Sequence, residues 1–216
     1  MTSSKPSLEL SWVRVGGVCG MAGTLSYLAA AFLPLPDTLT YAAAFAFGPL
    51  LSVSALGLYH CLALHRDSPL LQIATLFAIA GGITVLIMLT VQQSIFGVMQ
   101  AAVDKAGEQP AKEVYEKIAE GLNTIHWGMD VAWDVLISVA AILFGIGMLR
   151  HPQFGKIIGA LGILLGSLLL VFNLYYFPTP PASVDSIDWG PFVALWFTAV
   201  FILLLRAGGW VREKTP

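Results

Sequence analysis

The sequence predicts an all-α membrane protein, a bundle of six transmembrane helices with both termini in the cytoplasm. The first observation is composition: the 216 residues are 57% hydrophobic and only 11% charged, whereas soluble domains carry about 25% charged residues. The second is that six stretches qualify as the roughly 20-residue apolar runs that cross a bilayer. The third is a bias of Lys and Arg toward one side of those stretches.

The six predicted spans follow one another as a single transmembrane domain, with prolines closing the first and the fifth. Their ranges are residues 12–33, 40–64, 70–93, 125–149, 154–177 and 189–205. The first run is longer than the 7–15 apolar residues of a typical signal peptide, so we expect it to be retained as a helix.

Orientation follows from the basic residues, which are enriched in cytoplasmic loops. If six helices alternate, the opposite side holds only Lys105, Lys112 and Lys117, together with many acidic residues. We therefore expect both termini in the cytoplasm and, by analogy, a bacterial inner (plasma) membrane. The basic residues assigned to the cytoplasmic side are Lys5, Arg14, Arg66, Arg150, Lys156, Arg206, Arg212 and Lys214.

The longest predicted connection, residues 101–121, lies on the outer side. Pro110 can begin a helix there, and the apolar residues that follow it recur at helical spacing. We expect a short amphipathic helix that lies on the outer surface or caps the bundle. Gly121 should break this helix, and Asn123 can cap the start of the fourth span. The recurring residues are Ala111, Val114, Ile118 and Leu122.

The fourth span carries the most costly side chains of the chain, His126, Asp130 and Asp134. A charged group at the centre of a membrane helix costs about 2.5–3.5 kcal/mol on insertion scales, so it needs a partner or a function. Asn123, Trp127, Asp130 and Asp134 follow one another at spacings of four, three and four, which places them on one face. Counted from the inner end, Asp134 lies in the outer third of a ~30 Å core.

Residues predicted to lie at the same depth in the membrane are the candidate neighbours of Asp130 and Asp134. Two carboxylates one helical turn apart repel when both are ionised, so a proton or a cation should be held there. We therefore predict an ion or substrate site open to the outer side. Its candidate residues are Asn123, His126, Asp130, Asp134, Asn173, Gln92 and Gln93, and Tyr27, Asp188 and Trp189 lie at a similar depth.

Small residues predict how the helices pack, because membrane helices associate through close backbone contact. The short connection at residues 151–153 makes spans four and five an antiparallel hairpin. Pairing about residue 152 sets Gly145 near Gly159, Ser138 near Gly166, and Asp130 at the depth of Asn173. The glycines on one face of the fifth span are Gly155, Gly159, Gly162 and Gly166, the first span has Gly16, Gly20 and Gly23, and such faces can also support a homo-oligomer.

Three functions remain open on this evidence. The first is a non-enzymatic protein that binds or transports a small solute or an ion, such as a proton, through an outward-facing polar pocket. The second is a structural or accessory subunit whose polar stripe joins helices or engages a partner. The third is a metal-dependent hydrolase using His126 and an aspartate, although a zinc site would need two more ligands.

Other classes are disfavoured by missing signals. No run of basic residues predicts nucleic-acid binding. Cys19 and Cys61 form no CxxC, no HxxxH pair occurs, and no span has a lysine placed to form a Schiff base within it. The sequence predicts no cofactor, and the lipid bilayer is the expected partner.

Overall fold

The computed structural model describes residues 5–107 and 109–214, which form helices and no strand. The all-α prediction is confirmed. Five helices are long and apolar enough to cross a membrane, and α6 is apolar but shorter, with 17 residues. The helices are α1 (Lys5–Phe32), α2 (Asp37–Arg66), α3 (Pro69–Lys105), α4 (Gln109–Met148), α5 (Gly155–Tyr176), a 3₁₀ turn η1 (Pro181–Val184), α6 (Gly190–Arg206) and α7 (Gly208–Lys214).

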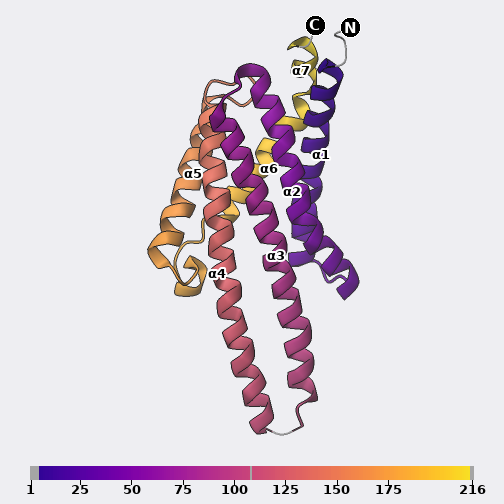
Figure 1. Cartoon of the computed structure of the whole chain (residues 1–216), viewed down its shortest axis with the longest axis vertical. Helices are drawn as coiled ribbons and strands as arrows, with labels where there is room; N and C mark the ends of the chain where they lie inside the picture. Colours follow the sequence, from indigo (N-terminus) through magenta and orange to yellow (C-terminus); the bar gives the residue numbers. More distant parts are fainter. Residues whose placement is uncertain (1–4, 108, 215–216) are drawn as a thin grey trace.

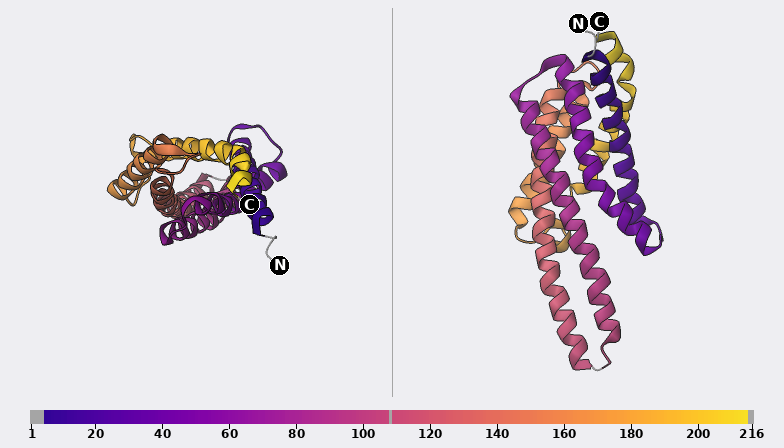
Figure 2. Two further views of the ribbon diagram at one scale, coloured as in Figure 1. Left: turned by 90° about the horizontal axis from the view of Figure 1, so that it is seen from above. Right: turned by 45° about the vertical axis from the view of Figure 1, so that its right-hand side comes forward.

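The helices alternate in direction, so that α1 begins and α7 ends at the same end of the bundle (Figures 1 and 2). The α2–α3 and α4–α5 connections lie at that end too. We call it the basic end, because it includes Arg66, Arg150, Lys156 and Arg206. The opposite end, where α3 meets α4, is the hairpin end. Helix α1 packs on α2 and α6, and α4 packs on α3 and α5.

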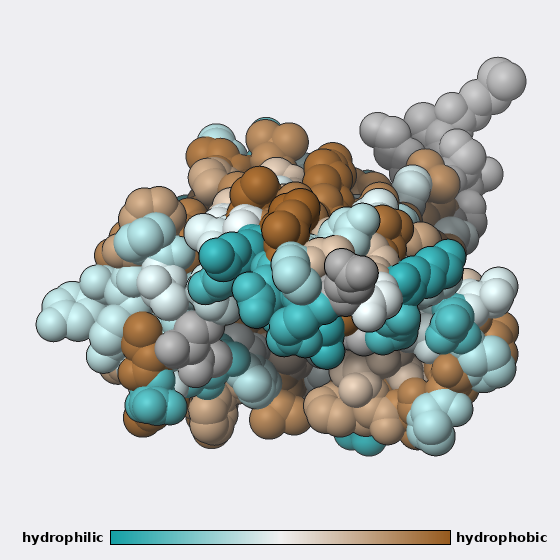
Figure 3. All heavy atoms as spheres, turned by 90° about the horizontal axis from the view of Figure 1, so that it is seen from below, coloured by the Kyte–Doolittle hydropathy of each residue, from teal (hydrophilic) through white to brown (hydrophobic). Residues whose placement is uncertain are grey.

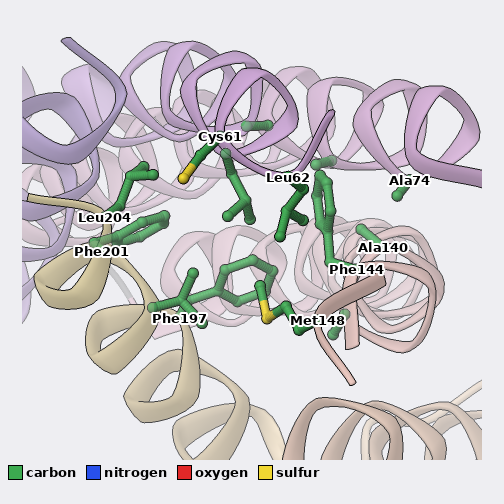
Figure 4. Close-up of a cluster of buried hydrophobic side chains, with 14 of the residues drawn as sticks. Cys61, Leu62, Ala74, Ala140, Phe144, Met148, Phe197, Phe201 and Leu204 are labelled. Carbon is green, nitrogen blue, oxygen red and sulfur yellow. The ribbon is translucent and has the colours of Figure 1, made fainter. Parts of the chain in front are cut away.

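The apolar core lies in the half of the bundle nearer the basic end, and helices α2, α4 and α6 supply much of it. Phe144 of α4 and Leu204 of α6 are fully buried, as is Cys61 of α2. Figure 4 shows the side chains of these three helices converging, with Phe197 and Met148 facing one another. Helix α6 packs chiefly on α1 and α5 and contributes one face to this core, and these contacts determine where the start of α6 lies.

Backbone contact through small residues joins α4 to α5 as the sequence predicts. A Cβ atom added to Gly145 would lie 2.7 Å from the carbonyl oxygen of Gly159, and the reciprocal distance is also 2.7 Å. A Cβ atom on Gly166 would lie 2.8 Å from the carbonyl oxygen of Ser138. Side chains cannot be accommodated at such distances, so these glycines permit the close approach of the two helices.

Other glycines of the predicted faces have different partners. Gly155 takes no part in packing, and its φ of 73° starts α5 from a turn that glycine adopts readily. Gly162 meets the indole of Trp196 on α6. On α1, Gly16 faces α2 whereas Gly20 faces Phe201 of α6. Because these faces are occupied within the chain, an oligomer, which stays a prediction, would need another surface.

The connection at residues 101–121 differs from the prediction. A helix does begin next to Pro110, as predicted, but it is not a separate short helix: α3 continues to Lys105, and α4 begins at Gln109 and runs unbroken to Met148. With 37 and 40 residues, the two helices are about 55 and 60 Å long, against a hydrocarbon core of about 30 Å. They project as an antiparallel pair well beyond the other helices (Figure 1).

The projecting pair ends in a polar tip. Viewed from the hairpin end, hydrophilic residues form a band across the middle of the molecule, and hydrophobic residues lie mainly above and below this band (Figure 3). Gly121 does not break α4, and Asn123 caps nothing, because both lie within the helix. An internal glycine costs a helix only about 1 kcal/mol, and the neighbouring α3 supplies packing along the same length.

At the basic end, aromatic rings in edge-on and tilted contact hold α7 against the bundle. The imidazole of His151 is 1% exposed, and its centroid lies 4.7 Å from that of Trp210 and 5.1 Å from that of Phe154. Burial lowers the pKa of His151 to about 4, although an interaction with the backbone of Cys61 acts in the opposite direction and raises this pKa. The ring is therefore neutral at pH 7 and packs as an aromatic group.

Candidate functional site

A buried aspartate on α4 is hydrogen-bonded to an asparagine on α5. Asn173 Nδ2 donates to Asp134 Oδ2 at 2.9 Å and to the carbonyl oxygen of Leu169 at 3.0 Å. Asp134 is 6% exposed and Asn173 is fully buried. The sequence predicts an amide from the fifth span at this depth, and the structure brings Asn173 to the acidic stripe.

The amide reaches Asp134, however, and not Asp130, which the residue count places at its depth. The reason is the tilt of side chains toward the N-terminus of their own helix. In an antiparallel pair, Asp134 leans toward the hairpin end while Asn173 leans toward the basic end. The two side chains therefore converge from backbone positions about one turn apart, whereas Asp130 and Asn173 lean away from one another.

Three carboxylates of graded exposure lie near one another at this position. Asp188 is exposed, Asp130 is half-buried and Asp134 is buried, and each of the α4 aspartates is within electrostatic range of Asp188. Asp188 is held at the start of α6, where its Oδ1 accepts a hydrogen bond from the Gly190 amide at 2.8 Å. The phenol of Tyr27 on α1 is within electrostatic range of all three.

Several buried polar atoms around this group have no hydrogen-bond partner among the described residues. Asn173 Oδ1 belongs to a fully buried residue, and the indole Nε1 atoms of Trp133 and Trp189 are also unpaired. A buried polar group without a partner costs about 1–3 kcal/mol, and such groups in native proteins are normally satisfied by water or a ligand. Ser138 Oγ and both ring nitrogens of His126 also lack a hydrogen-bond partner among the described residues.

Two groups of aromatic rings include the sequence neighbours of the aspartates, Trp133 beside Asp134 and Trp189 beside Asp188. In the first group, the ring centroids of Tyr27 and Phe47 are 5.0 Å apart, and those of Phe47 and Trp133 are 6.3 Å apart. In the second, the ring centroid of Trp189 lies 6.0 Å from that of Phe172 of α5. Sequence reasoning did not find Phe47 or Phe172, because an apolar residue in an apolar span carries no signal of its own.

The remaining predicted site residues lie farther from Asp134 along α4 or are on α3. Asn123 lies about three turns from Asp134 along α4, roughly 16 Å, and so belongs to the projecting pair. His126 lies two turns from Asp134 on the same helix. Gln92 and Gln93 are half-buried on α3, and the amide that reaches Asp134 is that of Asn173 instead.

The described residues contain no group of three or more His, Cys, Asp or Glu side chains that could hold a metal ion. The metal-dependent hydrolase therefore gains no support from the geometry of His126 or the aspartates. Comparison of the chain with protein-family models, with curated proteins and with solved structures gives no match. The class that the fold supports is an integral membrane protein made of apolar helices.

Proposed function

We propose that α1 to α6 cross a membrane, six crossings in all, with the basic end in the cytoplasm, and that only the segments of α3 and α4 that project at the hairpin end lie outside it. Helix α6 rises only about 25 Å, which a bilayer accommodates by thinning at modest cost. The support for this orientation is that basic residues gather where α1 begins and α7 ends, since Lys and Arg are enriched in cytoplasmic loops.

Cysteine labelling in intact cells tests this orientation. In a variant lacking Cys19 and Cys61, we expect a membrane-impermeant maleimide to label Glu116→Cys on the projecting pair. It should not label Gln153→Cys at the basic end until the membrane is permeabilised. Both positions are exposed, so a difference in their labelling shows that they lie on opposite sides of the membrane. The reverse pattern would contradict the proposed orientation.

We propose further that the outer half of the bundle holds a cation-binding site, for a proton or a small solute cation, built on Asp134. The observation that carries this is the buried Asp134 carboxylate, whose neighbouring charges, Asp130 and Asp188, are both negative. Placing negative charges together in a low-dielectric region is unfavourable unless a proton or cation joins them. Asp188 is exposed and Asp130 is half-buried, so we expect a cation from the outer side to reach Asp134 past these two carboxylates.

Melting of the purified protein in detergent tests the cation site. The melting temperature should depend on pH between 5 and 8.5, or differ between LiCl, NaCl, KCl and propylammonium chloride at equal ionic strength, because bound cations stabilise the folded state. Asp134→Asn should remove most of this dependence while keeping the side-chain shape. Asp37→Asn is the matched control, since Asp37 is an exposed acid toward the same end.

A structural role is the second candidate, because the Asn173–Asp134 hydrogen bond joins α4 to α5 across their interface. That role predicts a lower melting temperature for Asp134→Asn with the pH and cation profiles of the parent retained. The same melting series therefore separates the two functions: a changed profile supports the cation site, and a uniform downward shift supports the structural role.

A further inference from the structure

We propose that the ligand of this site is a small organic cation with a primary ammonium group, held by Asp134 and Asn173 between aromatic rings. The inference rests on the proposed cation site and names its ligand class. An ammonium group carries a positive charge, several N–H donors and an apolar body, and the described residues around Asp134 offer a counterpart for each.

The charge and the donors match the polar atoms at the buried end. Asp134 uses Oδ2 to accept from Asn173 Nδ2, and its carboxylate can accept further hydrogen bonds. Asn173 Oδ1 is a buried acceptor without a partner, in a side chain that is itself fully buried. Because Asn173 Nδ2 donates a hydrogen bond to Asp134, the Asp134 carboxylate and Asn173 Oδ1 lie close together. An N–H group of the ligand placed beside them would give the unpaired Asn173 Oδ1 a donor.

The aromatic rings match the organic part of such a ligand. The series Tyr27, Phe47 and Trp133 has successive centroid distances of 5.0 and 6.3 Å, and the Tyr27 phenol lies within electrostatic range of all three carboxylates. Ring faces attract cations within about 6 Å, and this is the usual way in which proteins recognise alkylated ammonium groups. An inorganic ion gains little from an apolar wall.

The carboxylates are also arranged unfavourably for a bare metal ion. Divalent cations such as Ca²⁺ require six to eight oxygen ligands at about 2.3–2.6 Å, and no group of three acidic or histidine side chains among the described residues is close enough to supply them. An ammonium group needs direct contact with one carboxylate only. The charges of Asp130 and Asp188 then contribute by attraction at longer range.

Binding of simple probes to the full chain in detergent tests the inference. Propylammonium chloride should quench or shift the tryptophan fluorescence saturably and raise the melting temperature. We expect binding at least about tenfold tighter than that of KCl. Binding should also be tighter than that of tetramethylammonium chloride, which has the same charge but no N–H donor. Asp134→Asn should abolish the response to propylammonium.

Two tyrosine variants isolate the contribution of the rings. Tyr27→Leu should weaken propylammonium binding about five- to tenfold, as expected for loss of a partly desolvated cation–π contact. Tyr175→Leu is the matched control, because Tyr175 is 78% exposed on the outer surface of α5, and its affinity should equal that of the parent. If Asp134→Asn does not fold, Asp130→Asn replaces it and should weaken binding.

The outcomes separate this inference from the function on which it rests. A response to pH or to an inorganic cation that depends on Asp134, with none to propylammonium, leaves the cation site standing and overturns the ammonium ligand. No response to any cation or to pH overturns both. Propylammonium binding that survives both Asp134→Asn and Tyr27→Leu shows that the ligand binds elsewhere, and it overturns the inference.

Discussion

Gly159→Leu is expected to separate α4 from α5 and to cost more than about 4 kcal/mol of stability, the range of the most disruptive single substitutions. A Cβ atom at this position would lie 2.7 Å from the carbonyl oxygen of Gly145, 2.9 Å from the Leu149 nitrogen and 3.1 Å from its Cα. All three are backbone atoms and cannot turn aside as a side chain would. The yield of monodisperse protein and its melting temperature in detergent would measure the effect.

Gly121→Leu is the matched control for that substitution. Gly121 lies within the same helix as Gly145, but no heavy atom lies within 4 Å of a Cβ atom added there. Leucine is a better helix former than glycine by roughly 1 kcal/mol, so this variant should be as stable as the parent or slightly more stable. A Gly159→Leu protein that melts with the parent would show that α4 and α5 do not approach as described.

Asn173→Leu is expected to destabilise the protein by about 1–3 kcal/mol, the range for leaving a buried polar group unpaired, with removal of the unpaired Asn173 Oδ1 offsetting part of the loss. The substitution removes the donor to Asp134 Oδ2 and replaces it with an apolar side chain of similar size, so the loss would not come from a cavity. The melting temperature in detergent measures it, and the α4–α5 glycine contacts are unchanged by design.

A double variant provides the internal test. Replacing both partners of a buried polar pair with apolar residues is often nearly neutral, whereas removing one partner is costly. Asp134→Leu combined with Asn173→Leu should therefore recover much of the stability lost by Asn173→Leu alone. Additive losses in the double variant would mean that Asp134 and Asn173 do not interact.

The helices themselves were predictable because a membrane span is a local property. Each predicted range overlaps a helix of the structure, and the Gly145–Gly159 and Ser138–Gly166 contacts follow from folding a short connection between two antiparallel helices. The partner of Asp134 was missed by one turn because residue counting follows the backbone. The tilt of the Asp134 and Asn173 side chains moves their polar atoms toward one another along the helix axis.

The path of the projecting pair was missed for a different reason. The start of α4 at Gln109, next to Pro110, agrees with the predicted helix start. Gly121 and Asn123 are breaking and capping signals whose local effects are only about 1 kcal/mol each. These two are outweighed when α3 lies alongside α4. The aromatic contacts near the aspartates were equally inaccessible, since nothing in the chain around Phe47 or Phe172 distinguishes them from other apolar residues of their spans.

Apolar run length and the position of acidic residues within a run were sufficient to establish a helical membrane protein with an unusual fourth helix, because both depend on contiguous sequence. Which amide reaches Asp134, which aromatic rings contact one another near the aspartates and how far α3 and α4 project depend on contacts between residues distant in the chain. Those contacts form only when the helices pack. Their free energies exceed the local turn and capping preferences of single residues, which are what a sequence pattern reports.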